Sequence, residues 1–414
     1  MSTHVHSPPV LPPEEGVELV VRRLAEAPSL QPFDARTLAF LTVLSRTLSA
    51  DAALRSHGEV QALAFWLRPT ELRHLVERTR ASEGEDAVLV PRGTVFHVPP
   101  ANVDTLFVYS WALSMMVGNR NVVRLSQRLG GVGARVASLI EDVLAQPAHA
   151  DIQANTLFVR YGHDADRTRM LSAHCDVRVL WGGDAAVRTL RDIPLPPHAV
   201  ELVFPDRYSA AMLSSSAVAG LSADERDALA ERFANDAFWF DQMACSSPRL
   251  VAWLGSEDEM ERVAPDFWSK VADAAVRRNV LIDAATSLAK LTAAARAAAD
   301  EPVTSVTRVS PAVTVVRLSS LDGLQRMAPG GGFFHEVALS SVEALAPHLD
   351  RRDQTLTAFG VPRAALLAAA RVFNGRGIDR IVPVGQALAF HHVWDGYDLL
   401  QQFTRRVAVS TLGW

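Results

Sequence analysis

The chain has 414 residues, of which 49% are hydrophobic and 21% charged, an ordinary globular composition that can bury a full core in one large or two moderate domains. Its formal net charge of -5 gives no general attraction to nucleic acid, and we find no basic stripe interleaved with aromatic residues. The two cysteines, Cys175 and Cys245, are too few for a disulfide framework or a zinc site. We therefore expect no nucleic-acid partner and no metal.

The start of the chain carries no targeting pattern. Residues 1–16 are rich in proline and contain neither a basic nor an apolar signal segment, so we expect a flexible lead-in and a cytoplasmic protein. The longest uncharged apolar run, residues 105–119, is too short to span a bilayer and predicts a buried helix.

Alternating elements follow in chain order. Apolar residues recur at helical spacing through residues 18–81, with Asp34 placed to cap one helix, which predicts a helical N-terminal region. The stretch AVLVPRGTVFHVPPANVDTLFVYSWALSMMVGNRNVVRLS then predicts strand, tight loop, buried helix and a second strand ending near Leu125. A helix over 131–144 and the strands in NTLFVRYG, DVRVLWGG and AVELVF, with helices between them, favour a doubly wound, mostly parallel sheet.

A second series begins after Asp206. It predicts a helix over 223–237, the cysteine segment, a strand in RLVAWLG, a long helix from Glu257, an alanine-rich helix, strands in AVTVVRL and FFHEVALS, and a helix near 361–370. We place the domain boundary near Pro205, which gives a lead-in (1–16), a helical and cofactor-binding part (17–205), a catalytic domain (206–385) and a C-terminal segment (386–414) for packing or oligomerisation.

Cys245 lies in an aromatic and apolar segment, NDAFWFDQMACSSPRLVAW. A thiolate is a strong nucleophile near neutral pH, although a single cysteine is more often a small buried hydrophobic residue. Cys175, at the entry to an apolar strand, is the weaker candidate. Both interpretations stay open for Cys245 on the segment alone.

Three further features could carry chemistry. Asn102 stands at the start of a helix in HVPPANVDTLF, where it is a preferred N-cap and could also donate a hydrogen bond to an oxyanion. Arg124 and Ser126 end a strand where a cofactor lies in an open sheet, and the turn Gly182, Gly183 before a helix suits a phosphate.

The order of these features resembles the aldehyde dehydrogenase superfamily, and within it most closely the LuxC-type acyl-thioester reductases. The resemblance runs from FDARTLAFLTVLS and LAFWLRPTEL through VFHVPPANV and DQMACSSPR to RGIDRIVPVGQALAFHHVWDGYDLLQQFTRRV. It implies an aldehyde dehydrogenase-like α/β fold, with a doubly wound cofactor-binding domain, an α/β catalytic domain and a helical N-terminal region.

The resemblance also implies roles for the singled-out residues. Cys245 would be the acylated nucleophile, and Asn102 would form an oxyanion hole with the Cys245 N–H. Arg124 and Ser126 would contact the adenosine ribose or 2′-phosphate, and Gly182 and Gly183 would lie near the pyrophosphate.

Two positions depart from the superfamily pattern. In GGGFFHEV a glycine replaces the glutamate that holds the nicotinamide ribose, which leaves Glu336, displaced along the segment, as a candidate for that cofactor contact. Glu201 in AVELVFPDRYS lacks the two glycines that follow the general base of hydrolytic aldehyde dehydrogenases, so we expect a strand or ion-pair role for it. His97, His391 and His392 are interpreted as structural.

The resemblance implies NADPH-dependent reduction of an acyl thioester, on coenzyme A, a carrier protein or an acyl-transferring partner protein, to an aldehyde through an acyl-cysteine. It also implies a homo-oligomer. The alternatives are a cysteine-dependent acyltransferase or thioesterase without a redox step, an ordinary aldehyde dehydrogenase, and a non-catalytic binding protein that keeps the fold.

Overall fold

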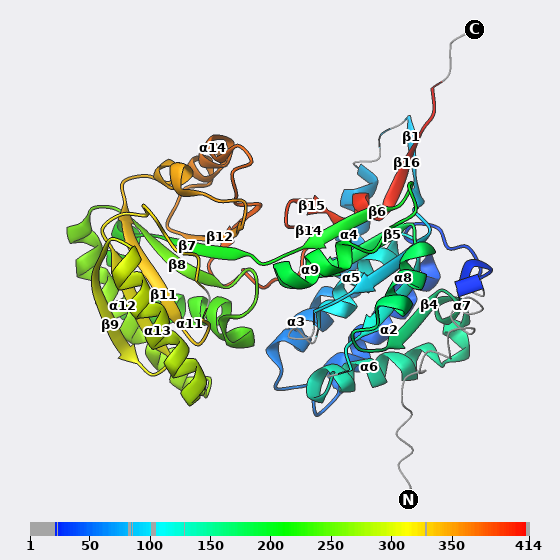
Figure 1. Ribbon diagram of the computed structural model, residues 1–414, viewed down its shortest axis with the longest axis horizontal. Coiled ribbons are helices and arrows are strands. Elements are labelled where there is room, and N and C mark those ends of the chain that lie inside the picture. The colour runs from blue at the N-terminus through cyan, green and yellow to red at the C-terminus, as the bar shows by residue number, and fades with distance from the viewer. Residues whose placement is uncertain are drawn as a thin grey trace, which may run out of the picture. The chain divides into compact units, whose positions relative to one another are not determined.

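The computed structural model describes residues 21, 22, 24–81, 84, 86–100, 105–127, 129–327 and 329–410. The chain divides into two compact units (Figure 1). The first contains the chain up to Pro205 together with the residues from Phe390 onward, and the second runs from Asp206 to Ala389.

Short helices and strands alternate in the first unit. The helices are α2 (Ala35–Ala50), α3 (Gly58–Trp66), α4 (Pro69–Ala81), α5 (Leu106–Met116), α6 (Gly131–Leu144), the 3-10 helix η1 (Pro147–His149), α7 (Ala150–Ala154), α8 (Ala165–Ala173), α9 (Asp184–Arg191) and α15 (Leu399–Gln402). The strands are β1 (Ala87–Pro91), β2 (Thr94–Val98), β3 (Arg120–Leu125), β4 (Thr156–Arg160), β5 (Val177–Trp181), β6 (Val200–Phe204), β14 (Val393–Trp394), β15 (Tyr397–Asp398) and β16 (Thr404–Ala408).

The helical N-terminal region is confirmed. The Asp34 carboxylate accepts a hydrogen bond from the Arg36 N–H at 2.9 Å, so it caps α2 as the sequence predicts. Helix α2 buries Phe40, Leu44 and Leu48, residues spaced four apart on one face. The predicted buried helix is α5, whose residues from Phe107 to Met116 are all buried.

The first unit is built on a parallel sheet. Its five strands have the order β4-β3-β2-β5-β6, and every neighbouring pair is parallel. The long apolar run before α5 divides into two strands at Gly93, because β1 instead pairs antiparallel with the C-terminal strand β16. Gly93 has φ +132°, and a Cβ there would lie 2.0 Å from the Asp176 carboxylate, which accepts the Thr94 N–H at 2.7 Å. Only glycine fits this turn.

The second unit has its own sheet and helices. The helices are α10 (Ser215–Ala219), α11 (Ala223–Phe238), the 3-10 helix η2 (Trp239–Gln242), α12 (Glu257–Arg277), α13 (Ala284–Asp300), the 3-10 helix η3 (Glu343–His348) and α14 (Arg363–Phe373). The strands are β7 (Tyr208–Ser214), β8 (Pro248–Leu254), β9 (Val303–Ser310), β10 (Val313–Leu318), β11 (Phe333–Leu339), β12 (Asp353–Phe359) and β13 (Arg380–Pro383).

These strands form a sheet of order β13-β12-β7-β8-β11-β10-β9, parallel except for the antiparallel edge pair β9 and β10. Side chains of the central strands alternate between two cores. Leu213 and Trp253 pack with α11 and α12 on one face, and Met212 and Ala252 pack with α13 and α14 on the other. Helices therefore cover both faces of the sheet, which confirms the predicted α/β fold.

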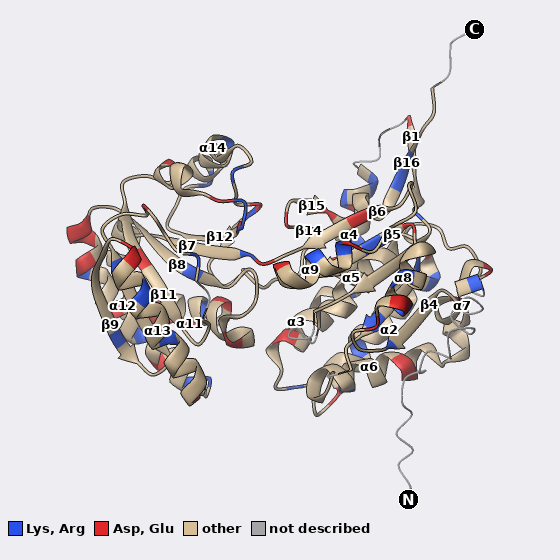
Figure 2. Ribbon diagram, in the orientation of Figure 1, with Lys and Arg blue, Asp and Glu red and all other residues tan. Residues whose placement is uncertain are grey.

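Charged side chains are scattered over the helices and strands of both units (Figure 2). The helices of the described residues are too short or too polar for any of them to cross a membrane.

Candidate active site

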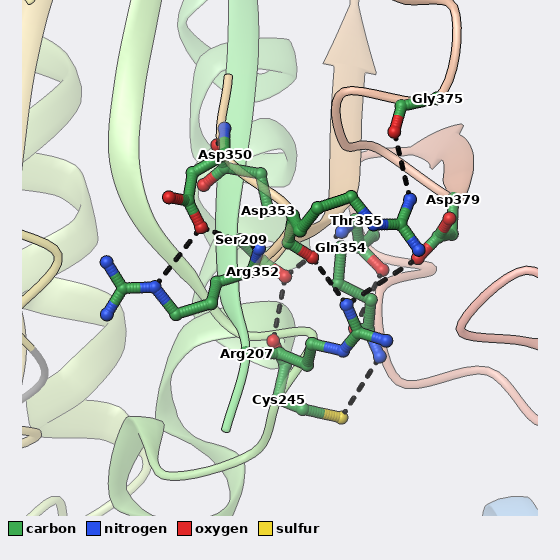
Figure 3. Close-up of polar contacts among 11 residues, drawn as sticks. Arg207, Ser209, Cys245, Asp350, Arg352, Asp353, Gln354, Thr355, Gly375 and Asp379 are labelled. Carbon is green, nitrogen blue, oxygen red and sulfur yellow. Dashed lines mark hydrogen bonds and ion pairs between the residues drawn. The ribbon is translucent and has the colours of Figure 1, made fainter. Parts of the chain in front are cut away.

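Cys245 lies on the loop between η2 and β8, which follows helix α11 in the chain (Figure 3). The chain reaches it through three consecutive residues with left-handed backbone, Phe240, Asp241 and Gln242, whose φ angles are 54°, 54° and 65°. Such a conformation costs on the order of 1 kcal/mol or more for each residue other than glycine, so the surrounding contacts must enforce it. The Cys245 side chain is half-buried.

Ser209 and Gln354 hold the cysteine from the neighbouring strands. The Ser209 hydroxyl, on β7, donates to the Cys245 carbonyl at 2.7 Å, and its oxygen accepts the Thr355 N–H at 3.2 Å. From β12, the Gln354 side-chain amide donates to Cys245 Sγ at 3.5 Å. These contacts join the cysteine loop to two adjacent strands, as Figure 3 shows.

Arg249 also stabilises this loop, through hydrogen bonds from its side chain. Its guanidinium donates to the carbonyl oxygens of Arg207 (2.8 Å), Gln242 (3.2 Å) and Ala244 (3.4 Å). Burial lowers the pKa of Arg249, and the nearby Tyr208 and Cys245 side chains partly offset this effect. The loop carbonyls are thus held by a buried cation close to the cysteine.

Gln242 ties the cysteine loop to the glycine turn formed by residues 330–332. Its amide NH₂ donates to the carbonyls of Pro248 and Phe333, both at 3.0 Å. Its amide oxygen accepts the N–H groups of Gly332 (2.9 Å) and Phe333 (3.0 Å). The side chain is fully buried, so it makes all four bonds that a carboxamide commonly supports in the interior.

The glycine turn has no room for a side chain at its last residue. Gly332 has φ +75°, and a Cβ there would lie 1.7 Å from the Ala312 carbonyl oxygen. The buried Lys290 ammonium donates to the carbonyls of Gly331 (2.7 Å) and Pro311 (2.9 Å), and burial lowers its pKa to about 8. The glycine turn is therefore packed tightly and is bonded to the cysteine loop through Gln242.

Glu336 lies inside the second unit on β11. One carboxylate oxygen accepts the indole N–H groups of Trp253 (3.2 Å) and Trp268 (2.7 Å), and the other pairs with Arg317 at 2.9 Å. Both oxygens of this buried carboxylate are engaged, which gives Glu336 a structural role. Its predicted cofactor contact stays a prediction.

The predicted cofactor residues of the first unit follow strands of its parallel sheet. Arg124 is the penultimate residue of β3, donates to the Tyr161 and Gly162 carbonyls at 3.4 and 2.7 Å, and stacks over the Tyr161 ring at 4.9 Å. Ser126 directly follows the last residue of β3 and is half-buried. The carboxyl ends of β3 and β5 lie at the same edge because both strands are parallel to β2.

Gly182 and Gly183 link β5 to α9. The Gly182 N–H donates to the Phe204 carbonyl at 3.1 Å, and Gly183 is the N-cap of α9. A Cβ at Gly182 would meet nothing nearer than the Ala186 Cβ at 3.8 Å, so the face of this turn is open. The helix N-terminus supplies the partial positive charge that a phosphate requires.

Three other expectations concern polar residues of the first unit. Asn102 lies outside the described residues. His97 is fully buried between the Ser110 hydroxyl (2.8 Å) and the Asn121 amide oxygen (3.0 Å), which confirms its structural role. Glu201 pairs with the buried Arg178 at 2.9 Å and with Arg191 at 3.0 Å, which confirms the expected ion pair.

The second cysteine has a different environment. Cys175 is buried, its thiol faces the Ser172 carbonyl at 3.3 Å, and burial raises its pKa to about 12. Its thiolate is therefore scarce at neutral pH, and its side chain is more deeply buried than that of Cys245.

The comparisons with known proteins agree with this architecture. A family model described as acyl-CoA reductase (LuxC) matches residues 64–406. The chain belongs to the LuxC family. It is similar to the long-chain acyl-protein thioester reductases of Aliivibrio fischeri (26% identical over 167 residues, 40% of this chain and 33% of that protein) and Photorhabdus laumondii subsp. laumondii (22% over 194 residues, 46% and 38%).

These alignments span 33% and 38% of the length of the two curated relatives. Among solved structures, aldehyde dehydrogenase 21 from Physcomitrella patens superposes with a TM-score of 0.65 at 11% identity, covering 95% of this chain and 90% of that one. The fold of this LuxC-family chain is therefore that of the aldehyde dehydrogenases.

Sequence reasoning missed four residues around Cys245: Ser209, Gln242, Arg249 and Gln354. Gln242 left one signal, an amide three residues before the cysteine, directly after the aromatic run Phe238–Phe240 and Asp241. Gln354 and Ser209 left none, because they come from strands 36 or more residues away along the chain.

Proposed function

We propose that this LuxC-family protein reduces an acyl thioester to an aldehyde, using NADPH and a covalent acyl-Cys245 intermediate. The observation that carries the proposal is the cysteine loop. The loop that carries the half-buried Cys245 thiol is held by Ser209, Gln242 and Arg249, in a chain whose family model is described as acyl-CoA reductase. The names of the curated relatives, long-chain acyl-protein thioester reductase, support the same substrate class.

Each residue has a proposed part in the reaction. The Cys245 thiolate forms a bond to the thioester carbonyl carbon, the carbon bond to the departing sulfur breaks, and the departing thiolate takes a proton from solvent. Asn102 and the Cys245 N–H donate to the carbonyl oxygen while it carries negative charge. Because a thiol leaves readily, no strong general acid is required.

The first unit offers a fitting place for a dinucleotide. Gly182 and Gly183 would lie against the pyrophosphate at the start of α9, where the turn is open. Arg124 and Ser126 would contact the ribose or its 2′-phosphate from the end of β3. When bound, the cofactor supplies the hydride that turns the acyl-cysteine into a hemithioacetal. Loss of the Cys245 sulfur from that hemithioacetal then releases the aldehyde.

The ion pairs of Glu201 argue against a hydrolytic aldehyde dehydrogenase. That activity requires a base that activates water against the acyl-enzyme, and Glu201 is instead bound to two arginines. The acyl-cysteine should therefore persist until it is reduced by hydride or attacked by a thiol. The acyl donor in this proposal is coenzyme A, a carrier protein or an acyl-transferring partner protein, and the protein acts as a homo-oligomer.

One assay separates the proposal from its rivals. Purified protein is mixed with acyl-CoA of several chain lengths, and NADPH absorbance, free thiol and aldehyde are followed together. The reductase consumes NADPH in step with thiol and aldehyde release. A thioesterase releases thiol without NADPH, a binding protein does neither, and an ordinary aldehyde dehydrogenase makes acid from aldehyde without a thiol.

A further inference from the structure

Gln354 places a carboxamide against the sulfur of Cys245. It belongs to β12, is 1% exposed, and its Nε2 lies 3.5 Å from Cys245 Sγ, within hydrogen-bond range for sulfur (Figure 3). Burying an amide costs free energy unless it makes hydrogen bonds. The hydrogen-bond partners of Gln354 therefore fix the position of its side chain.

The amide has a defined orientation. The buried Thr355 hydroxyl donates to the Gln354 amide oxygen at 3.1 Å, which leaves the NH₂ group to face the sulfur. Ser209 bridges the same region, since it accepts the Thr355 N–H and donates to the Cys245 carbonyl. The donor and the sulfur are therefore fixed to each other through two neighbouring strands.

We propose that Gln354 is a catalytic residue that donates a hydrogen bond to the Cys245 thiolate. A neutral donor favours the anionic sulfur, because a hydrogen bond to the charged form stabilises that form. Arg249, a charged group that interacts with Cys245, donates its guanidinium hydrogen bonds to three backbone carbonyls. Gln354 acts on the sulfur atom itself.

The consequence for catalysis rests on the proposed function. The Cys245 thiol loses its proton to solvent, and Gln354 stabilises the resulting thiolate until the sulfur forms its bond to the carbonyl carbon. After the aldehyde leaves, the same donor receives the returning thiolate. Gln354 gains and loses no proton in either step.

The test measures how fast iodoacetamide alkylates Cys245 as a function of pH. It needs no acyl substrate and no cofactor, so a failed reductase assay and a failed Gln354 assignment remain distinguishable. The protein carries Cys175→Ser, and peptide mass spectrometry confirms the site of alkylation. The variants are Gln354→Met, which keeps the size and removes the donor, and Thr355→Val, which removes the group that orients the amide. The matched control is Gln325→Met, because the Gln325 side chain is exposed and bonds within its own loop.

In Gln354→Met the midpoint of the pH–rate curve should rise by about one unit, so that alkylation below the wild-type midpoint slows about tenfold. The rates should converge at high pH, where both thiols are ionised. Thr355→Val should shift the midpoint in the same direction by less, and Gln325→Met should leave it in place. An unchanged midpoint in Gln354→Met, or a lower high-pH plateau at the original midpoint, would overturn the proposal. If Gln354→Met does not fold, an unchanged midpoint in Thr355→Val overturns it.

Discussion

Replacing Gln242 should destabilise the second unit far more than a surface glutamine does. The variant Gln242→Met fills the same space but removes four buried hydrogen bonds, to Pro248, Gly332 and Phe333. Two N–H groups and two carbonyls lose their partner, and each such loss costs about 1 to 3 kcal/mol. Because the loop can relax, we use the low end and expect a loss of about 4 kcal/mol in the free energy of unfolding.

The measurement is equilibrium urea unfolding followed by tryptophan fluorescence. Trp253 and Trp268 are buried in the second unit and should report its transition. The control is again Gln325→Met, which should change stability by less than about 0.5 kcal/mol. A loss below about 1 kcal/mol in Gln242→Met would refute the reasoning, because it would show that these four bonds do not hold the loop. The folded variant should also alkylate more slowly at Cys245, since the left-handed residues before it lose their constraint.

Three further outcomes are expected. Asn102→Ala should lower kcat by about 10² to 10³ if Asn102 supplies an oxyanion donor. If Asn102 is only an N-cap, the variant should lose about 1 kcal/mol of stability and little of its rate. Measuring kcat and the melting temperature of this one variant distinguishes the two roles. Burial lowers the pKa of His97 to about 4, below the unfolded value near 6.5, so its contribution to stability is full above about pH 6.5 and is lost as pH falls towards 4. Urea unfolding of wild type and His97→Asn is compared at pH 7 and pH 5. Between these pH values the free energy of unfolding should fall by about 2 kcal/mol more in the wild type than in the variant. An equal fall in both proteins would contradict this role of His97. Glu201→Gln leaves the buried Arg178 guanidinium without its carboxylate. It should therefore lower the free energy of unfolding by roughly 3 kcal/mol, while the reduction rate per folded molecule changes little. A loss of activity at unchanged stability would instead indicate that Glu201 is a catalytic base.

The elements that follow a clean periodicity could be predicted from the sequence. Helix α5 is a mostly apolar segment, and strands β2, β3 and β5 each contain a short run of β-branched and other apolar residues, the pattern of buried parallel strands and their crossover helix. The cysteine was found because its segment matches a family motif. Arg124 and Gly182 were predicted because they stand near the ends of strands in an open sheet.

Strand β12 was missed for a physical reason. It buries Asp353, Gln354, Thr355 and Thr357 although it has a neighbouring strand on each side, where a strand usually carries apolar residues. Its polar side chains are bonded to partners remote in the chain, such as Arg326 for Asp353. A pattern of hydrophobicity along the sequence does not encode such pairings, so it could not predict that Gln354 contacts the Cys245 sulfur.

The contacts of Gln242 were hidden for a related reason. They join residues about 90 positions apart, and they depend on left-handed backbone at Phe240 and Asp241, a conformation that those residue types seldom adopt. Likewise, Phe390 packs within the first unit against Trp66 and Tyr109, which lie far away along the chain, and local spacing does not encode this contact.

The most direct test of the proposed chemistry is a single-turnover experiment read by mass spectrometry. The enzyme is incubated with acyl-CoA in the absence of NADPH, digested, and searched for the acyl group, after which NADPH is added to a parallel sample. We predict that the acyl group is found on the peptide containing Cys245, persists for many turnover times, and leaves as aldehyde when NADPH arrives. Acylation at Cys175, or an acyl-Cys245 that leaves as free acid at the same rate with or without NADPH, would contradict the account.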